Sequence, residues 1–134
     1  MSYNFKNILP ENLISLAKKK PSSPAAIVSA HQNVTMESVK EACDLNLIVP
    51  FFIGEKEKIL NEAQILNWDI NNFKIIDKKS DEESANTGAM LAQKNEVKII
   101  IKGNLHTDVL MRSYLKKEYG LLEGKRLSHI WHVT

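Results

Sequence analysis

The stretch V-K-I-I-I-K-G-N-L-H-T-D-V-L-M-R-S, at residues 97–113, contains a complete strand-turn-helix pattern. Its β-branched residues, centred on Ile100, predict a buried strand that ends at Gly103, a residue that tolerates turn conformations other residues avoid. Thr107 is predicted to be the N-cap of the following helix, and Asp108 places a carboxylate in its first turn, where the helix dipole favours it. The chain is therefore expected to contain at least one strand that leads directly into a helix.

The same alternation recurs along the chain. Apolar runs predict strands at 25–30, 48–54, 73–77 and 97–101, each followed by helical spacing of apolar residues, and a further helix is expected at 11–19. Parallel strands need crossover connections, so strict alternation predicts a mainly parallel sheet with helices on both faces. We therefore expect one α/β domain over residues 1–134, with three α/β/α layers. Ligands in such folds lie at the carboxyl ends of the strands.

Local signals place several helix boundaries. Asn33 or Thr35 is expected to cap the helix after the first strand. Ser80 and Glu83 form a capping-box pattern, and the helix that they open carries small residues on its inward side. These are Ala85, Gly88, Ala89 and Ala92. The helix that follows Thr107 is expected to end at Gly120.

Composition narrows the class of protein. The chain has 134 residues, of which 43% are hydrophobic and 25% charged, with a formal net charge of +2. These values are typical of a soluble globular domain and give no indication of nucleic-acid binding. The single Cys43 excludes an internal disulfide and is expected to pack in the core. No leader or membrane span is evident, so we expect a cytoplasmic protein.

The turn after the fourth predicted strand has two interpretations. Lys102, Asn104, His106 and Thr107 lie beside a helix N-terminus, where unpaired N–H groups and the positive end of the dipole favour phosphate or carboxylate. A plain strand-to-helix turn with an N-cap would have the same pattern. Both interpretations remain open on this stretch alone.

Several blocks in order resemble a known family. K-G-N-L-H-T-D-V-L-M-R, then G-L-L-E-G-K-R-L-S-H-I, preceded by H-Q-N-V-T-M-E-S-V-K-E-A and L-I-V-P-F-F-I-G, are similar to the N-terminal half of the phosphate acetyl/butyryl transferases. The match runs from about Ala25 to the last residue. The K-G-x-x-H-T stretch, followed later by L-S-H, is its most specific part.

The resemblance implies a fold similar to one domain of the isocitrate and isopropylmalate dehydrogenases. It also implies exchange of acyl-CoA and phosphate for acyl phosphate and free CoA, with CoA as a substrate and no metal or organic redox cofactor. Members of the family are longer, and most residues usually assigned to catalysis lie in their later part. We therefore expect either a truncated half of such an enzyme, inactive alone, or a non-catalytic phosphate- or nucleotide-binding module that needs a partner.

The residues expected to contact phosphate or CoA lie mainly in one turn. A phosphate needs oriented N–H donors and a cation, which the helix N-terminus, the Thr107 hydroxyl and Lys102 would supply. His106 is a candidate base or oxyanion donor, although a neutral structural donor is the simpler role. The full predicted set is Lys102, Gly103, Asn104, His106, Thr107, Arg112 and Ser128.

The last residues carry two further expectations. His129 and His132 would point to opposite faces of a strand, so no metal site is predicted there. The run Leu127 to Val133 is predicted to be a fifth strand with apolar side chains. Left bare, such an edge would recruit a second copy or a partner chain, whereas pairing beside the strand at 97–101 would leave a monomer.

Overall fold

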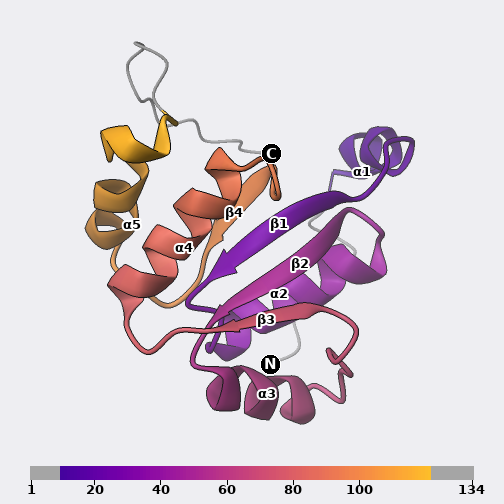
Figure 1. The fold of residues 1–134 in the computed structure, drawn as a ribbon. Coiled ribbons are helices and arrows are strands. Elements are labelled where there is room, and N and C mark those ends of the chain that lie inside the picture. The colour runs from indigo at the N-terminus through magenta and orange to yellow at the C-terminus, as the bar shows by residue number, and fades with distance from the viewer. Residues whose placement is uncertain (1–9, 122–134) are drawn as a thin grey trace.

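The structure, a computed structural model, describes residues 10–121. Four parallel strands form one sheet in the order β3-β2-β1-β4 (Figure 1). The elements are α1 (Glu11–Lys18), β1 (Ser23–Val28), α2 (Asn33–Asp44), β2 (Ile48–Gly54), α3 (Lys56–Ile65), β3 (Lys74–Asp77), α4 (Asp81–Gln93), β4 (Ile99–Lys102), α5 (Thr107–Tyr114) and the 3-10 turn η2 (Lys117–Tyr119). The alternation read from the sequence is confirmed.

The sheet has helices on both faces, as the predicted three-layer architecture requires (Figure 1). Ala25 and Ile27 of β1 pack in the cluster that contains the buried side chains of α2 and α3. Ala26 and Val28, which point the other way because side chains alternate along a strand, pack in the cluster under α4 and α5. All four residues are fully buried, which explains why β1 reads as a continuous apolar run.

The direction in which the sheet grows reverses once. From β1 the chain adds β2 and then β3 on one side, with α2 and α3 on one face. It then returns to the other side of β1 to add β4, and α4, the connecting helix, lies on the opposite face. Since crossovers between parallel strands are right-handed, a reversal of direction requires this change of face.

α4 packs closely on the sheet, as its small residues predict. Ser80 caps it by accepting a hydrogen bond from Glu83 N at 3.2 Å, as the capping-box pattern predicts. The reciprocal bond is shifted by one residue, because the Glu83 carboxylate accepts from Lys79 N rather than from Ser80 N. At Gly88, a Cβ atom would lie 2.8 Å from a methyl group of Val28. A larger residue at position 88 would therefore push α4 away from β1.

Three helices end in the same way, and the sequence interpretation did not foresee it. Asn46, Asn67 and Asn95 follow α2, α3 and α4 with φ between 51° and 58°, the left-handed conformation. After α4, Asn95 N bonds to Ala92 O and Glu96 N to Leu91 O, which is the Schellman arrangement. Asparagine takes the place that glycine most often fills.

Some boundaries differ from those predicted. α5 ends at Tyr114 and is followed by η2, so the helix predicted to continue to Gly120 is shorter. Within residues 10–121 β4 pairs only with β1. The predicted fifth strand, together with Ser128, His129 and His132, lies outside the described residues. None of the helices of the described part is long and apolar enough to cross a membrane.

Candidate functional site

The predicted turn lies where the sheet changes direction. β1 leads into α2 on one face and β4 leads into α5 on the other, while Val28 and Lys102 are register partners at the ends of the two strands. Connections that leave adjacent strands toward opposite faces open a crevice between them. In open α/β sheets this topological switch point is the usual place for a ligand.

Gly103 is required by a close approach. Its N–H donates to Val28 O at 2.7 Å, and Asn104 N donates to Ser29 O at 2.9 Å. A Cβ atom at position 103 would overlap both carbonyl oxygens. The sequence analysis expected Gly103 to adopt a turn conformation that other residues avoid, and this reason is wrong. Positive φ angles occur at Gly54 and Gly120, whereas Gly103 does not have one. Glycine is needed at position 103 because of the close approach to β1.

The N-cap of α5 differs from the one predicted. His106 is the N-cap, with φ −67° and ψ 139°, and Thr107 is the first residue of the helix. The carbonyl of His106 accepts from Val109 N and Leu110 N, so the first helical hydrogen bonds begin one residue earlier than expected. The His106 side chain makes no cap hydrogen bond to the N–H groups of the first turn. Thr107 therefore presents its hydroxyl and backbone beside an uncapped helix end.

The four helices that follow strands fall into two kinds. α3 and α4 have side chains at their N-termini, since Asp77 accepts from Lys56 N at 3.1 Å and Ser80 caps α4. The N-caps of α2 and α5 are Gln32 and His106, and neither makes a side-chain cap bond. The prediction that Asn33 or Thr35 caps α2 is therefore wrong. These two uncapped N-termini are the ones that follow β1 and β4. Two positive dipole ends thus flank the crevice at the switch point.

A groove connects Lys102 to the start of α2. It encloses about 230 Å³ between α2 and β4. The Lys102 ammonium lies 3.4 Å from the carbonyl oxygen of Gly103, and Lys102 forms no ion pair within residues 10–121. A cation without a carboxylate partner in that part of the chain therefore lies at the carboxyl end of β4. The groove is lined by Val34, Thr35, Ser38, Val39, Ala42, Ile101 and Lys102.

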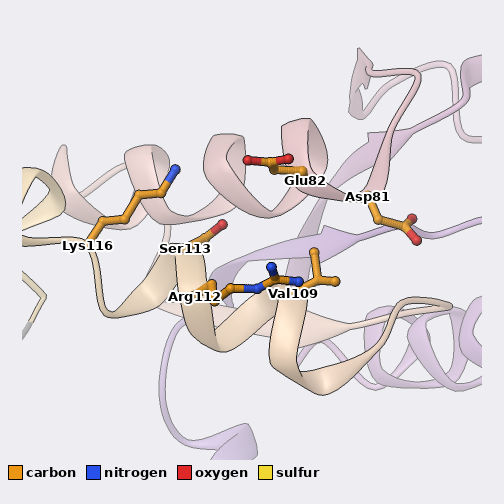
Figure 2. Close-up of a pocket in the computed structure, with 6 residues that line it drawn as sticks. All are labelled: Asp81, Glu82, Val109, Arg112, Ser113 and Lys116. Atoms are coloured by element: carbon orange, nitrogen blue, oxygen red, sulfur yellow. The ribbon is translucent and has the colours of Figure 1, made fainter.

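Arg112 lies in a different groove, between α4 and α5 (Figure 2). Its guanidinium reaches back along α5 to the Asp108 carboxylate at 3.1 Å, and both side chains are 72% exposed. Figure 2 shows Lys116 near one end of this groove and Asp81 at the other. Lys116 and Ser113 both donate to Asn86 Oδ1, at 3.0 and 2.7 Å. The structure therefore does not bring Arg112 together with Lys102.

Two polar residues at the crevice were missed from the sequence. Ser29, 1% exposed and with φ 57°, follows β1, and its hydroxyl donates to Asp81 Oδ1 at 2.8 Å. His31, in the turn before α2, has a buried Nδ1 with no hydrogen-bond partner in the described part of the chain. No sequence signal joins these positions, because Ser29 and Asp81 are 52 residues apart.

Cys43 and the acidic residues form no second site within the described chain. Cys43 is half-buried and belongs to neither core cluster, so the prediction that it packs in the core is wrong. Partial burial and the nearby Asp44 carboxylate raise the pKa of its thiol, which keeps it protonated. Among residues 10–121, no three or more histidine, cysteine or acidic side chains are grouped so that they could hold a metal ion.

Comparisons with known proteins identify relatives. The chain is 30% identical to the phosphate butyryltransferase of Clostridium beijerinckii over 130 residues, which is 97% of the chain and 41% of that protein. It is 36% identical to the phosphate acetyltransferase of Rickettsia felis over 82% of the chain and 31% of that protein. The chain thus spans at most about two-fifths of these relatives' length. No family model matches the chain.

Solved structures support the fold. A phosphotransacetylase from Streptococcus pyogenes superposes with a TM-score of 0.66 at 14% identity, over 80% of this chain and 42% of that one. A branched-chain phosphotransacylase from Enterococcus faecalis gives 0.57 at 21% identity, over 72% and 33%. The α/β fold and the resemblance to phosphate acetyl/butyryltransferases are therefore confirmed. The comparison with the dehydrogenases remains a prediction.

Proposed function

We propose that this chain, a relative of the phosphate acetyl/butyryltransferases, supplies the phosphate- or CoA-binding turn of a phosphate acyltransferase. The reaction would exchange acyl-CoA and phosphate for acyl phosphate and free CoA, with CoA as a substrate. One structural observation carries the proposal: among the four helices that follow strands, the two with no side-chain hydrogen bond at the N-terminus are α2 and α5, which follow β1 and β4, the strands that flank the switch point.

The chemistry of this crevice suits an anion. Backbone N–H groups at an uncapped helix N-terminus and the positive end of its dipole attract phosphate. Thr107 adds a hydroxyl at the start of α5, and Lys102 adds a charge that no carboxylate neutralises within residues 10–121. His106 is exposed at the N-cap, where an imidazole N–H would serve as a further donor.

The binding proposal is tested by titrating inorganic phosphate into ¹⁵N-labelled protein, with sodium chloride at matched ionic strength as the reference. We expect the largest amide shifts at residues 103–108 and at the start of α2. The N-terminal amides of α3 and α4 are internal controls, because Asp77 and Ser80 already occupy donors there. Shifts spread evenly over all four helix N-termini would contradict a specific site.

A pair of lysine variants distinguishes phosphate binding at this turn from general electrostatic attraction to a positively charged protein. Lys102→Gln removes the charge at the carboxyl end of β4, and phosphate binding should weaken about fivefold, the factor that corresponds to roughly 1 kcal/mol. Lys98→Gln removes the same charge from the residue just before β4, at the other end of the strand, and should change the dissociation constant little. Equal effects of the two variants would show that only net charge matters.

Catalysis is tested separately. Acyl-CoA formation from acyl phosphate and CoA is measured for residues 1–134 with and without the gene product encoded immediately downstream. We expect no appreciable turnover by residues 1–134 alone, because the resemblance implies that most catalytic residues lie in the later part of the relatives. Loss of a general base costs about a hundredfold or more in rate, and so does loss of the donors that bind the oxyanion. Turnover that appears only with the second product would identify a two-chain enzyme. Phosphate binding without turnover in either case would identify a non-catalytic module.

A further inference from the structure

Ser29 connects two segments that are far apart in the sequence. Its side chain donates to Asp81 Oδ1 at 2.8 Å, and Asp81 is the first residue of α4. Its backbone carbonyl accepts from Asn104 N at 2.9 Å and lies against Gly103. One buried residue therefore contacts the start of α4 through its hydroxyl and the turn after β4 through its carbonyl.

The backbone of Ser29 needs this support. Its φ of 57° is a left-handed conformation that serine seldom adopts and that persists only where surrounding contacts hold it. The hydroxyl bond to Asp81 is the side-chain hydrogen bond that Ser29 makes within residues 10–121. Backbone bonds act beside it, since Ala30 N donates to Ile53 O at 3.3 Å and Asn104 N donates to the Ser29 carbonyl itself. The hydroxyl bond is the contact through which the start of α4 can influence the direction of that carbonyl.

We propose that Asp81 is a positioning residue for the turn at residues 103–107, acting through Ser29. This inference rests on the proposed function, because the turn it positions is the proposed phosphate-binding turn. Asp81 does not cap its own helix, since Ser80 accepts the N-terminal hydrogen bond there. Its negative charge lies near a site proposed for an anion, so charge alone would oppose binding, whereas the hydrogen bond supports it.

Because the charge of Asp81 should weaken phosphate binding and its hydrogen bond to Ser29 should strengthen it, variants at position 81 can separate the two effects. Asp81→Asn keeps an oxygen acceptor for Ser29 and removes the charge, so it should bind phosphate as tightly as the wild type or more tightly. Asp81→Ala and Ser29→Ala remove the bond and should weaken binding about fivefold. Asp81→Glu keeps the charge but moves the acceptor by one methylene group, and it should resemble Asp81→Ala. A purely structural contribution of the carboxylate to α4 would instead make Asp81→Asn resemble Asp81→Ala.

Glu82→Ala is the matched control. Glu82 is the next residue of the same helical turn and lines the same groove between α4 and α5, but it forms no hydrogen bond to Ser29. It should leave the dissociation constant for inorganic phosphate within about twofold of the wild-type value, since exposed acidic residues contribute little.

Hydrogen exchange tests the coupling without any ligand. The Asn104 amide should exchange about tenfold faster in Asp81→Ala and Ser29→Ala, and at an unchanged rate in Asp81→Asn and Glu82→Ala. If the wild type shows no phosphate-induced shifts, the proposed function fails, yet the exchange rates still decide the positioning role. Unchanged exchange at Asn104 in Ser29→Ala would overturn the inference. If an alanine variant does not fold, the Asn and Glu variants at position 81 decide the question.

Discussion

Gly103 and the carbonyl oxygen of Ser29 lie so close together that only a hydrogen atom fits as the side chain at position 103. Gly103→Ala should therefore move the turn after β4 away from the end of β1 and lower the free energy of unfolding by about 2 kcal/mol. Urea unfolding measures the loss. Gly120→Ala is the control: Gly120 has φ 60°, but a Cβ atom at position 120 would have no heavy atom of the described residues within 4 Å.

The control variant should lose only about 1 kcal/mol, the cost of a left-handed alanine. Equal losses at positions 103 and 120 would mean that the close approach to Ser29 contributes nothing.

Replacing His106 by asparagine should stabilise the protein and weaken anion binding. An asparagine side chain at the N-cap accepts a hydrogen bond from the first turn of α5, which His106 does not, and the gain should be about 1 kcal/mol. The same side chain occupies an N–H group that phosphate would use. Urea unfolding and the phosphate titration check the two effects. Increased stability with unchanged phosphate affinity would argue against binding at this helix end.

The stability contributed by Asp77 should depend on pH in a defined direction. The hydrogen bond from Lys56 N, assisted by Lys79, holds the pKa of the Asp77 carboxyl below its ordinary value. A carboxyl whose folded-state pKa is lowered stabilises the folded protein above its unfolded pKa, about 3.9, and loses this contribution as pH falls through the folded value.

The free-energy difference between wild type and Asp77→Asn should accordingly be largest near neutral pH and shrink below about pH 4. Urea unfolding at several pH values between neutral and acid measures it. A difference that stays constant with pH would show that the charge of Asp77 is not involved.

Asn95 should be replaceable by glycine but not by alanine. With φ 58° after α4, Asn95→Ala places a Cβ in a left-handed conformation and should lower the free energy of unfolding by about 1 kcal/mol. Asn95→Gly removes that strain and should be neutral or stabilising. Thermal unfolding of the two variants distinguishes the outcomes. Similar losses in both would mean that the asparagine side chain, rather than the backbone conformation, stabilises the helix end.

The sequence was most informative where a pattern repeats over many residues. Period and run length predicted the four strands of residues 10–121, their helices and the parallel direction of the strands, and even the close packing at Gly88. The sequence was less informative where the identity of a single residue determines a helix boundary. His106 and Thr107 are neighbours, and backbone geometry, which composition does not reveal, selected His106 as the N-cap. The bond between Ser29 and Asp81 could not be foreseen, because it joins residues brought together only by the completed sheet.

The central place of β1 has a consequence for how the protein is made. β1 gains its first neighbour, β2, soon after it is synthesised, but its second neighbour, β4, is added only after β3 and α4. At translation rates of about 5–20 residues per second, one edge of β1 stays unpaired for on the order of several seconds on the ribosome. We therefore expect the nascent chain to fold from its α2 and α3 side first, with β1 as the edge that chaperones would shield in the meantime.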